Sequence, residues 1–211
     1  MKQDMKGRRR LMSGLGLTAA AVALGSGAAR AQAPAIRFQP ARHTEDEWMD
    51  KTPGKHRVII DVTSAAGVPD AIRFSGNLYT GNKNGYGVEE AEVAIILCLR
   101  HSATAFAYGE AIWAKHGKTL DPTATETPTV NPYDSAPRHD LSGLAKRGVQ
   151  FIVCGRASSG IARRIAGSGG DSDAILAEMV ANMIPSSRLV ATGVVGVTHA
   201  QEYGYSLLYV G

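Results

Sequence analysis

Short apolar runs that alternate with helical segments are the feature that most constrains the fold of this chain. Three of these runs, at residues 57–63, 92–99 and 149–155, are rich in β-branched residues and apolar enough to be covered on both faces of a sheet. Two shorter runs, at 188–192 and 205–210, predict a fourth and a fifth strand. Because helices separate the strands, crossover connections must join them. The pattern therefore predicts a three-layer α/β/α fold with a mainly parallel five-stranded sheet.

Helices are predicted from apolar residues at helical spacing and from capping residues. They cover 68–79, 103–115, 141–146, 156–165, a segment between Asp171 and Pro185, and 194–203. We expect Gly117 to end the second helix and Asp140 to cap the third. The glycine- and asparagine-rich stretch 81–87 predicts a surface turn, and 120–138 predicts an insertion that acts as a lid or an oligomer contact.

The first 33 residues predict an export signal. A basic start is followed by an apolar run at 11–29 that is rich in glycine and alanine, and then by a small-residue pattern. The glycines dilute the run below the hydrophobicity of a membrane anchor of about 20 residues, so we expect cleavage near 31–33. Cleavage after Ala31 is favoured over cleavage after Ala33, because Pro34 would follow the second bond directly.

The basic start resembles a twin-arginine export signal. Arg8-Arg9-Arg10-Leu11-Met12 supplies the paired arginines, one variable residue and two apolar residues, and the weak hydrophobicity of the next run suits that route. The phenylalanine and the trailing lysine often found there are missing, so the general secretory route stays open. Either route predicts a periplasmic protein with no membrane association after signal cleavage. The mature chain then consists of an N-terminal arm at 34–55 and one domain at 56–211.

The charge of the chain argues against nucleic acid as a partner. The net charge is +4, but six of the 23 basic and one of the 19 acidic residues lie in the first 33 positions. The remainder holds 17 basic and 18 acidic residues, a net charge of about −1. Without a basic face or interleaved aromatic residues, the mature domain is not expected to bind nucleic acid.

Cys154 is the residue on which the functional prediction centres. It ends the run at 149–155 and precedes the helix at 156–165, so we expect its thiol at the carboxyl edge of the sheet, where ligands of parallel α/β proteins bind. The helix N-terminus and Arg156 favour the thiolate, which is the nucleophilic form. The alternative is a core cysteine that only fills space.

Cys98 and His101, at the end of the second strand, are supporting candidates together with Arg156, and Arg100 lies between them. Arg100 and His101 would hold an anionic sulfur species or lower a thiol pKa, although His101 also fits a plain loop residue. Cys98 and Cys154 leave three states open: independent thiols, a structural disulfide or a redox-active pair. His199 is a weaker candidate, because a surface histidine explains it equally well.

No metal site and no cofactor is predicted. Cys98 and His101 would give zinc only two of its three or four protein ligands. The glycine patterns match neither a Rossmann nor a phosphate-binding loop, and residues 155–160 do not form the elbow of a serine hydrolase. The sequence leaves open whether the protein is an enzyme.

The second half of the chain resembles the DsrE/DsrF-like family of small sulfur-handling α/β proteins. The similarity lies in the helix and strand at 141–155, which end at Cys154, and in residues 189–194 and 201–205, which are similar to the family ending "strand, G-V, helix, Q-x-x-G-Y, strand". It extends more loosely over residues 57–210. The export signal and the segments 120–138 and 167–184 depart from the family, whose sulfur relays are mostly cytoplasmic.

The resemblance implies a fold, an assembly and a chemistry. They are a five-stranded parallel sheet, a homo-oligomer of three or six subunits, and sulfur carried as a persulfide on Cys154. The implied partners are a small sulfur species or a thiol partner protein. Two functions thus stay open: an exported sulfur or thiol carrier, and a non-catalytic oligomeric module that binds a small ligand or a protein.

Overall fold

Five parallel strands form one sheet in the computed structural model of the protein, which describes residues 38–134 and 140–211. The strands are β1 (His56–Val62), β2 (Val93–Leu99), β3 (Gln150–Cys154), β4 (Ser187–Val190) and β5 (Ser206–Val210). Their order in the sheet is β4-β3-β2-β1-β5, and every pairing is parallel. The five-stranded parallel α/β fold expected from the sequence is confirmed.

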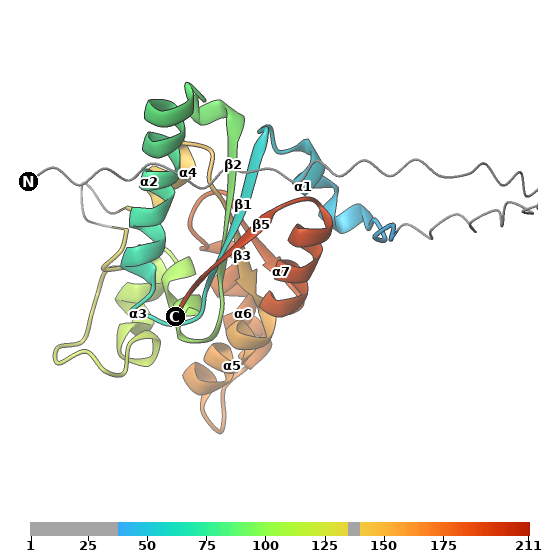
Figure 1. The fold of residues 1–211 in the computed structure, drawn as a ribbon. Coiled ribbons are helices and arrows are strands. Elements are labelled where there is room, and N and C mark those ends of the chain that lie inside the picture. The colour runs from blue at the N-terminus through green and yellow to red at the C-terminus, as the bar shows by residue number, and fades with distance from the viewer. Residues whose placement is uncertain (1–37, 135–139) are drawn as a thin grey trace, which may run out of the picture. The chain divides into compact units, whose positions relative to one another are not determined.

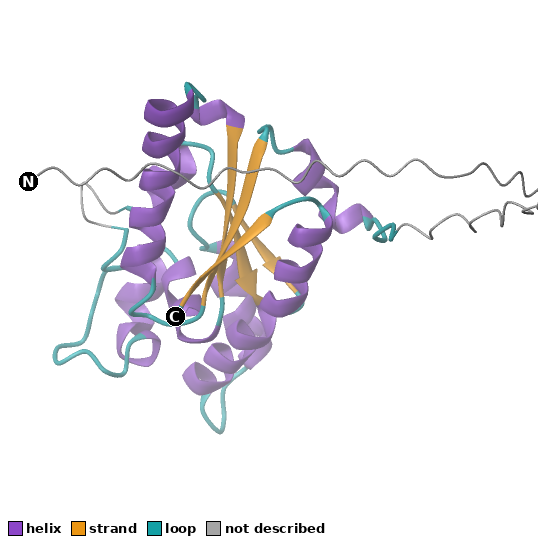
Figure 2. Ribbon diagram, in the orientation of Figure 1, coloured by secondary structure: helices purple, strands orange, loops and turns teal. Residues whose placement is uncertain are grey.

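Helices cover both faces of this sheet (Figure 2). The α-helices are α1 (Glu47–Lys51), α2 (Val68–Tyr86), α3 (Glu110–Leu120), α4 (Leu141–Lys146), α5 (Gly155–Ala166), α6 (Ser172–Ala181) and α7 (Gly193–Glu202). Three short 3-10 helices are η1 (Thr44–Asp46), η2 (Glu90–Glu92) and η3 (His101–Ala107). Within the described residues, no helix combines the length and the apolar character that a membrane crossing needs.

The strand order decides which helix covers which face. From β1 to β4 each connection moves one strand in the same direction, so right-handed crossovers place the intervening helices on one face. The last connection returns from β4 across the sheet to β5, so α7 lies on the other face. Figure 1 shows α2, α3 and α4 on one side of the strands and α1 and α7 on the other.

The core accordingly has two parts. Alternate residues of the central strands, such as Leu97, Phe151 and Val153, pack with α2 to α6 and η3 in the larger part. The residues between them, such as Cys98 and Ile152, pack under α7 and α1 in the smaller part. Most of the central strand side chains are fully buried, which explains why these strands read as continuous apolar runs.

The N-terminal arm expected at 34–55 packs on the smaller core where it is described. Met49 in α1 is fully buried, and its carbonyl accepts a hydrogen bond of 3.0 Å from the Tyr205 hydroxyl. Trp48 in the same helix is partly exposed and carries the Arg188 guanidinium over its ring at 4.3 Å. The predicted export signal and its cleavage site lie outside the described residues.

The turn predicted at 81–87 is wrong. α2 continues through these residues to Tyr86 and ends at Gly87, which adopts a left-handed conformation with φ of 68°. The Asn82 amide bonds back to the Leu78 carbonyl at 2.8 Å, and Lys83 pairs with Glu89 beyond the helix end. Residues 81–87 are almost entirely exposed, so these local bonds and the Gly87 cap, rather than packing on the sheet, accompany the extension of the helix.

The helix predicted at 103–115 is also wrong in its extent. A 3-10 helix, η3, ends at Ala107, Tyr108 is extended, and α3 begins only at Glu110. The break is held by contacts distant in sequence, because Tyr108 forms a bridge with Met183 and the Gly109 amide donates to the Asn182 carbonyl at 2.8 Å. Local periodicity cannot detect such a contact.

Gly117 lies inside α3 rather than at its end. A Cβ atom at Gly117 would overlap the Pro128 carbonyl oxygen, so this glycine lets the 120–138 insertion approach the helix. The described part of the insertion is held by Asn131, whose amide donates to the carbonyls of Phe106 and Tyr108 at 2.9 and 3.0 Å. It therefore packs against η3 and α3.

The cap predicted for α4 comes from a different aspartate. Asp140 occupies the N-cap position but makes no side-chain capping bond. Asp134 accepts hydrogen bonds from both the amide and the hydroxyl of Ser142, at 2.7 and 2.9 Å. Burial and the neighbouring Asp140 raise the pKa of the Asp134 carboxyl above its usual value.

Substitution of Gly117 tests the close approach of the insertion. We expect Gly117→Ala to lower the free energy of unfolding by about 1–3 kcal/mol or more, because the added methyl group collides with the Pro128 backbone. Gly76→Ala in α2 is the control, since a Cβ atom there meets nothing within 4 Å, and it should be neutral or stabilise by up to about 1 kcal/mol. Urea denaturation measures both, and equal effects would contradict the packing described.

Candidate functional site

Cys154 ends β3 and lies directly before α5, at the carboxyl edge of the sheet. Its side chain is 8% exposed. Because side chains alternate along a strand, Cys154 points to the same face as Ile152, which is the face covered by α7. The thiol is thus placed between the beginnings of α5 and α7.

A pocket of about 340 Å³ opens beside Cys154. Its lining comes from the carboxyl ends of β2, β3 and β4 and from the helix starts that follow β3 and β4: Arg100, His101, Cys154, Arg156, Ala157, Thr192, Gly193 and Val194. The amide of Arg156 donates to the Ala191 carbonyl at 3.2 Å, which ties the start of α5 to the loop before α7. Three strand ends therefore converge on one thiol.

Two helix N-termini meet at this pocket. α5 begins at Gly155 and α7 at Gly193, and the Thr192 hydroxyl accepts a bond from the Val195 amide at 3.4 Å. The N-terminus of a helix carries a partial positive charge and unpaired N–H groups, so both helices favour an anion in the space between them. The exposed guanidinium of Arg156 adds a full positive charge at the rim.

A buried ion pair fixes the other side of the pocket. Arg100 binds the Asp61 carboxylate through two bonds, from Nε at 2.7 Å and from Nη2 at 2.8 Å. The side chains are only 16% and 7% exposed, respectively. The bonds to Asp61 raise the pKa of Arg100, so its charge is permanent. Because two parallel hydrogen bonds join the Arg100 guanidinium to the two Asp61 oxygens, the guanidinium is held in one orientation.

His101 is held against Arg100. The remaining Arg100 nitrogen, Nη1, lies 2.5 Å from His101 Nε2, and because a guanidinium has no acceptor the ring nitrogen accepts this bond. His101 has a φ of 52°, a left-handed conformation that is uncommon for residues other than glycine. The strained backbone turns the chain at the end of β2, where His101 lines the Cys154 pocket.

Cys98 is placed near the site but not in the pocket. It is fully buried, and its thiol donates to the Gly193 carbonyl at 3.6 Å. Burial raises the pKa of Cys98 strongly, and the Asp61 carboxylate raises it further. Cys98 is therefore a neutral thiol and no nucleophile.

The register of the strands separates the two cysteines. Cys98 pairs with Ile152, two residues before Cys154. With strands about 4.8 Å apart and a rise of about 3.3 Å per residue, this offset puts the two Cα atoms about 8 Å apart, beyond the limit of roughly 7 Å for a disulfide. Both cysteines are free thiols in this structure, and the register disfavours the two paired states that the sequence left open.

Cys154, Arg156 and His101 thus line one pocket, together with Arg100, which the sequence placed beside His101. Sequence reasoning missed Asp61, Thr192 and Gly193. Asp61 could have been found from the sequence, because it is an acidic residue inside an otherwise apolar stretch of a predicted strand. Gly193 is the glycine of the "G-V" motif, but the motif does not indicate its close packing, in which a Cβ atom would lie 2.9 Å from Arg100 Cβ and 3.1 Å from the Cys98 sulfur.

His199 does not join this pocket. Its Nδ1 lies 2.6 Å from the buried Asp46 carboxylate, and its ring stacks on His43 with centroids 5.2 Å apart. It lines a different hollow of about 500 Å³ between η1, β4 and α7. The pair joins the N-terminal arm to α7. Among the described residues, no three histidine, cysteine or acidic side chains gather as a metal site.

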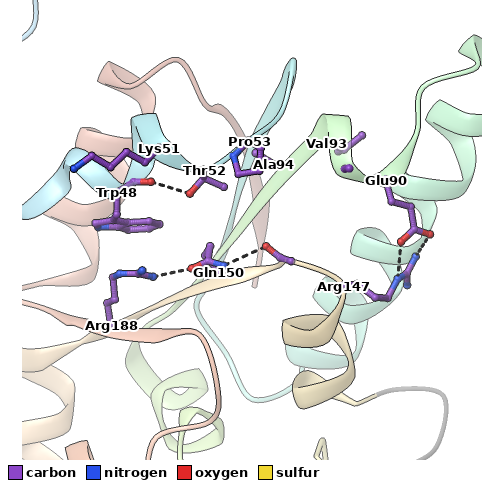
Figure 3. A pocket seen from close by; sticks show the side chains of 12 residues that line it. Trp48, Lys51, Thr52, Pro53, Glu90, Val93, Ala94, Arg147, Gln150 and Arg188 are labelled. Carbon is purple, nitrogen blue, oxygen red and sulfur yellow. Dashed lines mark hydrogen bonds and ion pairs between the residues drawn. The ribbon is translucent and has the colours of Figure 1, made fainter.

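Another hollow, of about 350 Å³, lies at the opposite edge of the sheet, where the strands begin (Figure 3). Its polar side chains already bind one another: Arg188 donates to the Gln150 amide oxygen at 2.7 Å, and Arg147 binds Glu90 through two bonds. Groups that are paired in this way leave few donors or acceptors for a ligand. The Cys154 pocket is therefore the better candidate site.

Fold and site together define a parallel α/β protein with a thiol pocket at the carboxyl edge of its sheet. No protein-family model and no curated protein matches the chain. Among solved structures, the chain is similar to a protein of unknown function, MTH1491 from Methanobacterium thermoautotrophicum. The TM-score is 0.42 and the identity 16%, over 74% of this chain and 99% of that one.

The thiols of Cys98 and Cys154 should differ in their rate of reaction with an alkylating reagent. In the native protein at about pH 7.5 we expect iodoacetamide to spare Cys98, because the residue is buried and its pKa is raised. In denaturant both thiols should react. Peptide mass spectrometry assigns the label, and modification of native Cys98 as fast as in the unfolded chain would contradict its burial.

The ion pair behind the pocket should be a main contribution to stability. We expect Asp61→Asn to lower the free energy of unfolding by about 3 kcal/mol or more, because it leaves the Arg100 charge partly buried without its partner. Asp50→Asn is the matched control: Asp50 pairs with Arg57 at 3.5 Å and is 56% exposed, so its loss should cost less than about 1 kcal/mol. Denaturant unfolding distinguishes the two, and equal losses would contradict the role given to Asp61.

Proposed function

We propose that the protein is an exported thiol protein of the DsrE/DsrF-like type that carries sulfur as a persulfide on Cys154. The observation that carries the proposal is the pocket in which the Cys154 thiol faces the N-termini of α5 and α7. Such surroundings stabilise a thiolate, a persulfide anion or a bound sulfur anion equally well. The resemblance of residues 141–155, 189–194 and 201–205 to the family supports the same chemistry.

The loading step needs no external oxidant if the donor is a polysulfide. The Cys154 thiolate attacks a terminal sulfur of the polysulfide, and a new S–S bond forms at Cys154. The S–S bond behind the attacked sulfur breaks, and the shortened polysulfide leaves with the electron pair. A partner thiolate then removes the outer sulfur in the same way and regenerates the Cys154 thiolate.

The other residues of the pocket form no covalent bond with the sulfur; the positive charges among them stabilise or attract the sulfur anion. Arg100 is fixed by Asp61, so it offers a positive charge that does not reorganise when the sulfur anion enters. Arg156, which is exposed, attracts the anion from solvent. His101, held against Arg100, lines the mouth of the pocket.

The export signal at residues 1–33 implies that this chemistry takes place in the periplasm. A cytoplasmic relay partner is then out of reach, and the pocket would serve a small sulfur species or an exported thiol protein. The pocket opens to solvent through exposed residues, including Val194, which is 54% exposed. That opening is compatible with either donor.

The low exposure of Cys154, 8%, favours the second candidate function. In that case the cysteine fills space, and the domain is a non-catalytic oligomeric module that binds a small ligand or a protein. Cys154→Ala would then bind and assemble like the wild type. Only the carrier requires the sulfur atom itself.

Loading with polysulfide tests the proposal directly. We expect intact-mass spectra of the wild type to gain the mass of one sulfur atom, reversibly with a thiol reductant, and Cys154→Ser to gain nothing. Cys98→Ser is the matched control and should load like the wild type, because its thiol is buried and neutral. Sulfide alone should add nothing, since no oxidant is present. A wild type that gains no sulfur would rule out the carrier.

The role of Arg156 is tested by the rate of loading. We expect Arg156→Ala to slow loading several-fold at low salt and less at high salt, because mobile ions screen the field of an exposed charge. Arg164→Ala is the control, since Arg164 lies in the last turn of α5 and does not line the pocket. Equal rates for both variants would show that Arg156 does not attract the donor.

A further inference from the structure

The two edges of the sheet differ in their protection against another strand. At one edge, β4 has four residues, follows Pro185 and carries the charged Arg188. At the other edge, β5 has neither a charge nor a proline. Leu207, Leu208 and Tyr209 of β5 are 42%, 39% and 65% exposed. Edge strands of natural proteins usually carry charges, prolines or bulges, so an apolar edge that lacks them is suited to pairing.

The free backbone groups of β5 can be identified from its pairing with β1. The Thr63 amide donates to the Val210 carbonyl at 3.0 Å, so Val210 points its backbone toward β1, and by alternation so does Leu208. Leu207 and Tyr209 therefore point their N–H and C=O groups away from the sheet. In the described part of the chain no strand pairs with them.

An apolar groove of about 370 Å³ runs beside this edge, between β5 and α2. Phe74, Leu78, Tyr86 and Leu208 supply its apolar side chains, and Tyr86 is 82% exposed. Gly81 also lines the groove, and a Cβ atom there would meet nothing within 4 Å, so the single chain has no steric need for glycine. A helical glycine costs about 1 kcal/mol relative to alanine, and it allows a close approach from outside.

We propose that β5 and α2 form an interface with a second copy of this chain, in which the β5 strands pair antiparallel about a two-fold axis. The backbone groups of Leu207 and Tyr209 point outward, so these residues form the hydrogen-bonded pairs of the new ladder. Leu207 pairs with the partner's Tyr209, and Tyr209 pairs with the partner's Leu207. Leu208 then faces the partner's Leu208 across the axis, on the face that carries the groove and α2. The two sheets become one continuous sheet.

The surface fits its own copy for reasons of charge and size. β5 is uncharged, and the ions of α2 come in pairs, Arg73 with Asp70 and Lys83 with Glu89, so a two-fold contact brings no unpaired like charges together. A strand of five residues is too short for a stable dimer by itself. α2, with 19 residues and a length of about 28 Å, extends the contact to the size of ordinary interfaces.

The dimer is independent of the proposed function, because no residue of the Cys154 pocket lies on β5 or α2. Sedimentation velocity of the full chain tests it. We expect the wild type at about 100 µM to sediment as a dimer, or as a six-subunit assembly that contains this two-fold contact, and Leu208→Lys to raise the dissociation constant of the contact at least about 100-fold, since two lysines would meet at the axis. Leu189→Lys on β4 is the control, because Leu189 is 38% exposed against 39% for Leu208, and it should leave the dimer intact.

Two further measurements guard against a variant that merely misfolds. Tyr86→Ser changes a side chain that is 82% exposed and should weaken the dimer at least about 10-fold without a change in urea unfolding of the monomer. Hydrogen exchange of the wild type should protect the amides of Leu207 and Tyr209, and Leu208→Lys should lose this protection while Val210, bonded to β1, keeps it. A monomeric wild type, an oligomer insensitive to Leu208→Lys, or equal effects of the two lysine variants would overturn the proposal.

Discussion

The return of the chain from β4 to β5 is the constraint on which the rest of the structure depends. Since β1 to β4 advance in one direction, right-handed connections put α2 to α6 on one face and leave the other face to α7 and the N-terminal arm. α7 must therefore begin at the carboxyl end of β4 and cross the central strands. Its N-terminus consequently faces that of α5 across Cys154, and the pocket arises from the topology.

Electrostatics within the pocket follow from burial. The Asp61 carboxylate lies inside the smaller core and is compensated by Arg100, which leaves the guanidinium at the pocket wall in a fixed orientation. The same carboxylate and the same burial raise the pKa of Cys98, two residues before Arg100. Two cysteines at the ends of neighbouring strands thus have different environments: Cys98 lies beneath Gly193, and Cys154 lies at the helix start with a cavity beside it.

The strands were predictable because strands covered on both faces are mostly apolar: β2 is apolar at every position, and polar residues in β1 and β3 are confined to Asp61 and the first one or two positions. α4, α5 and α7 were predictable to within one residue, because their lengths follow from local signals such as Gly148 and the residues before Gly193. The sequence failed at residues 81–87 and at Tyr108. At Tyr108 a contact with the distant Met183 outweighs the local preference, whereas at 81–87 the exposed end of α2 simply continues to the cap at Gly87.

The sequence by itself determined that Cys154, Arg156 and His101 lie at one edge of a sheet, because parallel strands bring their carboxyl ends together and these residues follow such ends. It also determined that the strands are buried. Only the tertiary structure decided that Asp61 restrains Arg100, that Cys98 is sealed under Gly193, and that β5 remains an unprotected edge. These features depend on strand order and register, and no local pattern of residues encodes which strand lies next to which.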